Sequence, residues 1–228
     1  MADIFTHDLR AAVAASGCPV CRVVAGSVRN WIDSFWREGK NDPSARREFF
    51  AAGGFCREHA LLLRELAQGT RGGAAVADVY RWLAERDGEW LARASAAIAG
   101  SRPRGRLQLE RRRRCPACVE QDAATLRKLE FLLGALRAGS MQASYASSDG
   151  LCMPHLLAAA THAAGDRDVC RFLLDDARRR LAELSRGLDE YDRKRDHRFR
   201  DEPKGMEQLA PAAAIARYAG GTETQWMA

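Results

Sequence analysis

The amino-acid sequence predicts an all-α protein made of two tandem, zinc-stapled helical modules related by internal duplication. Ala, Leu and Arg dominate the 228 residues and runs of β-branched residues are scarce, which favours helices. No alternation of apolar and polar residues persists, and hairpin turn signals between such runs are missing. A set of Cys and His residues occurs twice, which indicates the duplication.

Each copy of the set combines a CPxC motif with a CxxH motif further along the chain. The four motifs are Cys18-Pro-Val-Cys21, Cys56-Arg-Glu-His59, Cys115-Pro-Ala-Cys118 and Cys152-Met-Pro-His155. The second CPxC follows the first after 97 residues, and the second CxxH follows the first after 96. Six of the seven cysteines belong to this pattern, so chance is a poor explanation.

The first module is expected to cover residues 1–100. A helix near residues 3–15 precedes a longer one that starts at the CPVC motif and runs to about Glu38. Asn41-Asp42-Pro43 caps a short helix, and Gly53-Gly54 turns the chain into the CxxH helix. A last helix follows residues 69–73. Apolar side chains at three- and four-residue intervals mark the expected buried faces: Val20, Val24, Trp31, Ile32 and Phe35, then Val76, Val79, Tyr80, Leu83, Trp90 and Leu91.

The second module, residues 115–200, repeats this order. Its expected helices start at Cys115, with Leu126, Leu129, Leu132 and Leu133 buried, at Cys152 and at about Asp166. Asp78-Val-Tyr-Arg-Trp-Leu83 corresponds to Asp168-Val-Cys-Arg-Phe-Leu173, so the repeat extends beyond the ligands. On this alignment Cys170 takes the place of Tyr80, and we expect a buried core thiol there, with a reactive thiol as the alternative.

Each set offers three thiols and one imidazole, the ligand count of a closed tetrahedral zinc site. We therefore expect two zinc ions per chain, one held by Cys18, Cys21, Cys56 and His59 and the other by Cys115, Cys118, Cys152 and His155. Pro fits the first turn of a helix that starts at each CPxC motif, and the Cys and His of each CxxH motif face the same side one turn apart. Both halves of a set therefore place ligands at helix N-termini, where the helix dipole stabilises the negative charge of three thiolates around Zn²⁺. Arg22 and Arg57 are candidate partners beside the first set, and Arg114 beside the second.

A site with four protein ligands leaves no open position for water, so catalysis at the metal is disfavoured and no catalytic residue is assigned. Iron instead of zinc stays open. A thiol-redox protein that uses the CPxC pairs is an alternative, because a thiolate is favoured at a helix N-terminus. The βαβ context of thioredoxin-like proteins is missing from the sequence.

Charge is concentrated between the modules. The net charge is +6, and the linker at residues 101–114 supplies all of it with seven Arg and one Glu. Nucleic-acid binding through residues 102–114 is therefore one alternative, although no aromatic residues interleave the arginines. A solvated linker is favoured over it, and an unidentified protein is the expected partner.

No apolar stretch approaches the length that spans a bilayer, and the first ten residues carry charge where a signal peptide needs an apolar core. Seven cysteines without an export signal favour metal binding in the reducing cytoplasm over disulfides. The expected location is the cytoplasm.

The C-terminal tail, residues 201–228, follows a dense mixture of acids and bases. The segment 196–207, which joins the second module to the tail, is a solvated helix end or, alternatively, a binding site in which side chains converge on a ligand: His197, Arg200, Asp201, Glu202 and Glu207. The order CPxC, GFCxxHA, CPxC, DGLCxPH and RFRDEPxG resembles an uncharacterised bacterial family, a domain of unknown function. The matching residues are Cys18–Cys21, Gly54–Ala60, Cys115–Cys118, Asp149–Leu156 and Asp196–Gly205. The resemblance implies this architecture and brings no activity with it, so we expect a zinc-binding scaffold protein.

Overall fold

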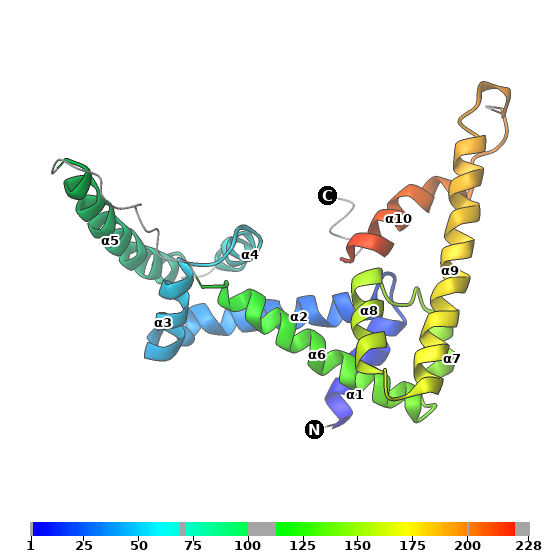
Figure 1. Ribbon diagram of the computed structural model, residues 1–228, viewed down its shortest axis with the longest axis horizontal. Helices are drawn as coiled ribbons and strands as arrows, with labels where there is room; N and C mark the ends of the chain where they lie inside the picture. The colour runs from blue at the N-terminus through cyan, green and yellow to red at the C-terminus, as the bar shows by residue number, and fades with distance from the viewer. Residues whose placement is uncertain (1, 69–71, 100–112, 200, 222–228) are drawn as a thin grey trace. The chain divides into compact units, whose positions relative to one another are not determined.

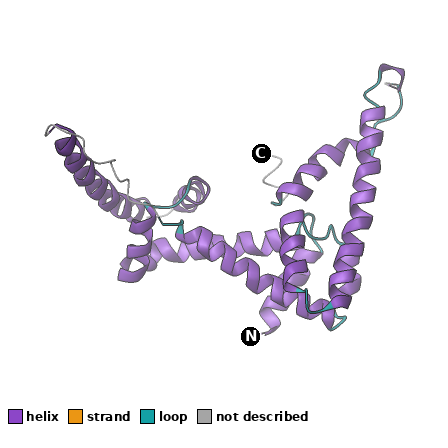
Figure 2. Ribbon diagram, viewed as in Figure 1, coloured by secondary structure: helices purple, strands orange, loops and turns teal. Residues whose placement is uncertain are grey.

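The chain is helical throughout the part that the structure describes. The computed structural model describes residues 2–68, 72–99, 113–199 and 201–221. Within these ranges every regular element is a helix and no strand occurs (Figure 1 and Figure 2), which confirms the all-α prediction. None of the described helices has the length and apolar character needed to cross a bilayer.

The helices begin and end close to the residues that the sequence predicts. The first half of the chain forms α1 (Ala2–Val13), α2 (Pro19–Arg37), the 3-10 helix η1 (Gly39–Asn41), α3 (Pro43–Ala52), α4 (Arg57–Ala67) and α5 (Gly72–Ala99). The second half forms α6 (Pro116–Arg137), α7 (Gln142–Ser147), α8 (Met153–His162), α9 (Arg167–Arg193), the 3-10 helices η2 (His197–Phe199) and η3 (Met206–Leu209), and α10 (Ala210–Ala219).

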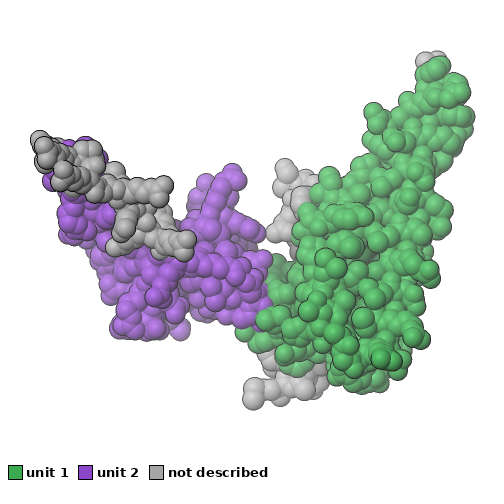
Figure 3. Space-filling view, in the orientation of Figure 1, with its two compact units in different colours: residues 1–26, 124–228 green, residues 27–123 purple. Residues whose placement is uncertain are grey.

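Two compact units divide the chain, and they are not two consecutive stretches. One unit contains residues 1–26 and 124–228, and the other contains residues 27–123 (Figure 3). We call them the outer unit and the inner unit, because the second is inserted in sequence between the two parts of the first. Helices α2 and α6 each begin in one unit and end in the other. The compact units therefore differ from the expected modules at 1–100 and 115–200.

The outer unit has an aliphatic core. Buried residues of α6 recur at helical spacing, and α1, α7, α8 and α9 contribute further buried residues. These side chains are Leu9 and Val13, Leu129, Leu132 and Leu136, Tyr145, Leu156, and Val169 and Leu173. Helices α8, α9 and α10 also pack on one another, so the C-terminal segment belongs to this core (Figure 1).

The inner unit has an aromatic core. Phe35 of α2, Phe49 of α3 and Phe55 form three ring contacts with centroid distances of 5.0 to 5.4 Å. Tyr80 of α5 adds an edge-to-face contact to Phe49 at 5.8 Å. Such aromatic pairs contribute about 0.5–1.5 kcal/mol beyond their area burial. This cluster fixes α3, the turn after it and α5 around the start of α4.

Several residues on the predicted buried faces are not buried in the structure. Leu91 of α5 is 59% exposed and Leu126 of α6 is 45% exposed. Cys170 is only partly buried and so does not belong to the buried core that the alignment with Tyr80 predicted for it. Val79 and Leu83 of α5 match Val169 and Leu173 of α9 in burial, as the alignment of the repeat predicts, while the duplication itself stays a prediction.

Candidate metal centres

All eight predicted ligand residues lie in two clusters, but their pairing differs from the prediction. Within the described residues, Cys18, Cys21, Cys152 and His155 form the outer cluster, and Cys56, His59, Cys115 and Cys118 form the inner cluster. In each cluster the four ligating atoms lie within 4.8 Å of one another. The first CPxC thus meets the second CxxH, and the first CxxH meets the second CPxC. The expected pairing within each consecutive set is wrong.

The lengths of the helices explain why each CPxC motif does not meet the CxxH motif that follows it. Helix α2 has 19 residues and carries the chain about 28 Å away from its own CPxC motif. Helix α3 has 10 residues and covers only about 15 Å, too little to bring the following CxxH back to Cys18. The same holds for α6, with 22 residues, and the 6-residue α7 that follows it. The predicted arrangement, in which a short helix returns the chain to its own CPxC motif, therefore does not form.

The ligands lie at helix N-termini, as predicted. Helices α2 and α6 begin with the Pro of their CPxC motifs, while Cys56 and Cys152 occupy the N-cap positions of α4 and α8. The outer cluster therefore joins the starts of α2 and α8, and the inner cluster joins the starts of α4 and α6. Two helix N-termini directed at each cluster stabilise the negative charge of its thiolates.

The distances inside each cluster match the edges of a zinc tetrahedron. Bond lengths of about 2.3 Å to sulfur and about 2.0–2.1 Å to nitrogen place two sulfurs about 3.8 Å apart, and sulfur and nitrogen about 3.5 Å apart. In the outer cluster Cys21 Sγ and Cys152 Sγ are 3.7 Å apart, and His155 Nδ1 lies 3.5, 3.3 and 3.2 Å from the sulfurs of Cys18, Cys21 and Cys152. Each imidazole presents its Nδ1 atom to the thiols, so Nδ1 is the ligand atom that this geometry offers.

The inner cluster has the same dimensions. Cys56 Sγ and Cys118 Sγ are 3.7 Å apart. His59 Nδ1 lies 3.2, 3.7 and 3.4 Å from the sulfurs of Cys56, Cys115 and Cys118. The sulfur separations of 3.7 Å far exceed the S–S bond length of about 2.0 Å, and all these cysteines are free thiols. The geometry fits a metal site and not a disulfide.

Protons are shared unequally in the outer cluster without a metal. Hydrogen bonds from Cys152 and then from Cys21 hold the pKa of Cys18 far below its ordinary value, although burial opposes this. Hydrogen bonds with Cys18 and then with Cys21, together with burial, raise the pKa of Cys152 far above the ordinary range. Burial alone would lower the pKa of His155, but the Cys18 and Cys21 sulfurs outweigh it and raise that pKa to about 9. A bound metal cation would replace the protons on Cys152 and His155.

Without a metal, the groups of the inner cluster also differ in how tightly they hold their protons. The hydrogen bond with Cys115 raises the pKa of His59 to about 9. Burial opposes ionisation of Cys115, but His59 and several backbone N–H groups lower its pKa to about 6. Burial and the neighbouring sulfur of Cys56 raise the pKa of Cys118 to about 12. Each cluster therefore carries one readily ionised thiol beside groups that hold their protons.

The three arginines next to the motifs differ in what they contact. Arg22 donates to the Ser16 carbonyl oxygen at 2.5 Å, and its Nε is buried without a hydrogen-bond partner among the described residues. Arg57 is exposed. Arg114 pairs with Asp122, which raises its pKa, and the charges of Cys118 and Cys115 add to this effect. For Arg22, Arg57 and Arg114, the role of a partner to a metal ligand stays a prediction.

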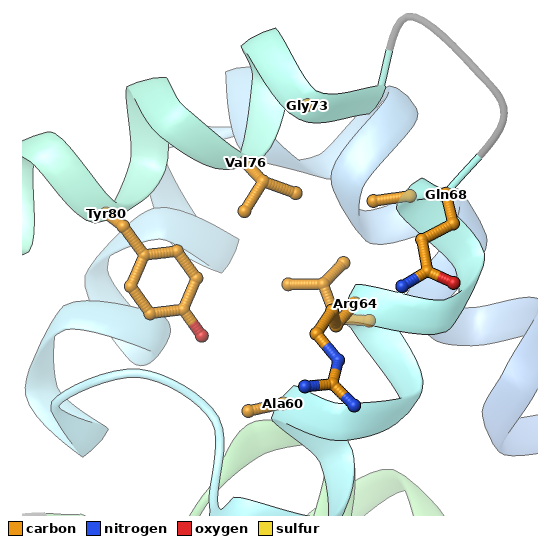
Figure 4. A pocket seen from close by; sticks show the side chains of 8 residues that line it. Ala60, Arg64, Gln68, Gly73, Val76 and Tyr80 are labelled. Carbon is orange, nitrogen blue, oxygen red and sulfur yellow. The ribbon is translucent and has the colours of Figure 1, made fainter.

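A cavity of about 390 Å³ opens between α4 and α5, next to the inner cluster (Figure 4). Its walls are mostly apolar, with Leu63, Ala67 and Val76 among them, and Figure 4 shows the Arg64 and Tyr80 side chains directed into it. Burial raises the pKa of the Tyr80 hydroxyl. The volume falls in the range of small-ligand sites.

Two acidic side chains of the C-terminal segment pair with basic side chains at the end of α9, and ligand binding by this segment stays a prediction. Arg193, in the last turn of α9, donates to Glu202 at 2.5 Å, and Lys194 donates to Glu207 at 3.1 Å. The Gly205 N–H, first among several donors, lowers the pKa of Glu207 to about 2. The His197 side chain is 88% exposed, and Arg200 lies outside the described residues. Most of the Arg-rich linker, residues 101–112, also lies outside them, so nucleic-acid binding stays a prediction.

No family model, no curated protein and no solved structure matches this chain. The functional conclusion therefore depends on the two clusters, each of which brings together four side chains able to hold a metal ion. One further contact has no local signal in the sequence: just after the end of α10, the Gly221 N–H donates to Cys21 Sγ at 3.2 Å.

Proposed function

We propose that this chain is a zinc-binding helical protein with two structural Cys3His sites, and that it serves as a binding or scaffold protein in the cytoplasm. The observation that carries the proposal is the tetrahedral spacing of three Sγ atoms and one Nδ1 atom in each cluster. Thiolate-rich sets of this kind favour zinc over hard cations. With four protein ligands, the bound ion has no open position for a substrate or a reactive water, which favours a structural role.

In this role each ion joins two helix starts that lie far apart in the chain. The outer site would hold α2 to α8, and the inner site would hold α4 to α6. Metal binding then contributes directly to folding, because the ligand set exists only in the folded chain. The arrangement would present rigid helical surfaces to a protein partner.

Metal analysis of the purified chain tests the proposal. We expect two zinc ions per chain, and one for Cys56→Ala, because this change removes a ligand from the inner cluster and leaves the outer cluster complete. Cys170→Ala is the matched control, since Cys170 belongs to neither cluster, and it should retain two.

Thiol titration separates this proposal from the redox alternative. Six thiols should be masked until a chelator is added, while Cys170 reacts in either state. Free titration of the CPxC pairs without a chelator, or a Cys56→Ala chain that still holds two tightly bound ions, would contradict zinc binding at these sites.

A further inference from the structure

The end of α10 lies directly on the sulfur atoms of the outer cluster. The Gly221 N–H donates to Cys21 Sγ at 3.2 Å, across 200 residues of chain. At Gly220 an added Cβ would lie 3.3 Å from Cys152 Sγ and 3.4 Å from Cys21 Sγ. Gly220 also has φ +75°, a conformation that L side chains rarely adopt. Glycine is thus required here both by the backbone and by the neighbouring sulfurs.

Arg217 anchors this segment to the chain just before Cys152. Its guanidinium donates to the Leu151 carbonyl oxygen at 2.6 Å and to the Asp149 carbonyl oxygen at 2.7 Å. The Asp149 carboxylate accepts from the Gly17 N–H at 2.6 Å, next to Cys18. One short segment therefore fixes α10 and both halves of the outer cluster relative to one another.

We propose that α10 and Gly220–Gly221 form a lid on the outer metal site, so that docking of the lid and metal binding stabilise each other. This inference rests on the proposed function, in which the cluster holds zinc. An N–H donor to a thiolate stabilises its negative charge without occupying a coordination position. The lid also covers the sulfurs against chelators and oxidants. Because linkage is reciprocal, a metal that fixes the Sγ positions strengthens lid docking as much as the lid strengthens metal binding.

Two glycine variants isolate the contact between the lid and the sulfurs. Gly139 has φ +74°, nearly the same as Gly220, but an added Cβ there meets nothing within 4 Å. Gly139→Ala and Gly220→Ala thus impose similar backbone strain, and only the second pushes a methyl group against Cys152 and Cys21. A second pair is Arg217→Ala with the exposed Arg171→Ala as its control.

The experiment follows zinc release from each site within one molecule. The zinc-loaded full chain is mixed with a chelator, its thiols are pulse-labelled with N-ethylmaleimide, and peptides are mapped by mass spectrometry. We expect Gly220→Ala and Arg217→Ala to speed labelling of Cys21 and Cys152 about tenfold, and to leave Cys56 and Cys118 at the wild-type rate. Gly139→Ala and Arg171→Ala should leave all rates unchanged.

Three results would contradict the lid proposal: equally faster labelling at the outer and inner clusters, equal effects of Gly139→Ala and Gly220→Ala, or no faster labelling in any variant. Should zinc protect none of the cysteines even in the wild type, the proposed function would fail instead, so the two failures are distinguishable. Hydrogen exchange of the unmutated chain gives a second measurement. Amides of residues 210–221 should exchange faster after zinc is removed, and unchanged exchange there would also contradict the lid.

Discussion

His59 and His155 each point Nδ1 at three sulfur atoms, and this contact decides how a metal competes with protons. In both clusters the sulfurs raise the histidine pKa to about 9, so each imidazole is protonated at neutral pH when no metal is bound. A metal ligand must be neutral imidazole or thiolate. Zinc binding therefore has to displace these protons.

This predicts a metal affinity that rises with pH. At pH 7 the inner site should release at least two protons per zinc, from His59 with pKa about 9 and Cys118 with pKa about 12. Since protons compete with the metal, affinity increases as pH rises towards 9 and decreases on acidification. Calorimetry in buffers of different ionisation enthalpy counts the protons. Cys170→Ser should give the same count, and an affinity independent of pH between 7 and 9 would contradict the protonation described here.

Among single residues, the motifs identify the ligands and little else. Cys and His at CPxC and CxxH spacing can be recognised as metal ligands, because this local spacing is itself typical of a metal site. Gly220 and Gly221 cannot be recognised in this way, since nothing nearby in sequence links them to Cys21, 200 residues earlier. Arg22 and Arg57 adjoin ligands in sequence, yet neither contacts a ligand sulfur through a described hydrogen bond.

At the scale of helices, α7 depends on α9 for its C-terminal end. Arg180 of α9 donates to the carbonyl oxygens of Tyr145 at 3.0 Å and Ala146 at 3.1 Å, and also to that of Ser148. These carbonyls lie at or just after the C-terminal end of α7, where intrahelical hydrogen bonds run out, and the Tyr145 carbonyl also accepts from the Ser148 N–H. Asp176 holds Arg180 in place through a 2.6 Å contact, with side chains only 6% and 10% exposed.

Asp176→Ala should therefore destabilise the zinc-loaded chain by about 3–5 kcal/mol, because it leaves the Arg180 charge buried and unpaired. Asp175→Ala is the matched control. Asp175 is 63% exposed and 3.8 Å from Arg178, so its loss should change the free energy of unfolding by less than about 0.5 kcal/mol. Urea unfolding followed by circular dichroism measures both, and equal effects would refute the role given to Asp176.

Helix bounds follow from local signals, whereas burial along a helix depends on its neighbours. Asp42 caps α3 through the Ser44 N–H and Gly53 ends the helix with φ 72°, as the sequence indicates. Leu91 and Leu126 fit the apolar periodicity of their helices but face solvent. Periodicity locates the apolar face without showing how far a neighbouring helix covers it.

At the scale of the whole chain, the pairing of the motifs has a direct test. In the structure Cys18 and Cys152 share the outer cluster, and Cys56 belongs to the inner one. The double variant Cys18→Ser with Cys152→Ser should retain one zinc, while Cys18→Ser with Cys56→Ser should retain none. Pairing within each consecutive set predicts the opposite results. Native mass spectrometry after dialysis against a weak chelator counts the ions, and Cys170→Ser should hold two.

The pairing could not be predicted from the motifs, because both arrangements use the same residues at the same local spacing. The lengths of α2 and α3 decide between them, since a 19-residue helix followed by a 10-residue one does not return to its start. A sum of predicted helix lengths contains this information, but the matched CPxC and CxxH repeats favour the simpler consecutive pairing.

The ligands of the inner cluster lie in sequence between the two halves of the outer cluster. During synthesis, the two ligand sets are therefore completed one after the other. Cys56 and Cys118 are 62 residues apart, which a ribosome covers in about 3–12 s, whereas Cys21 and His155 are 134 residues apart and need about 7–27 s. The inner ligand set is thus complete while the second half of the outer set is still being made. Cys18 and Cys21 are the first thiols to be synthesised, but their partners Cys152 and His155 are among the last ligands to be made. Both thiols must therefore stay reduced until the second half of the chain is complete.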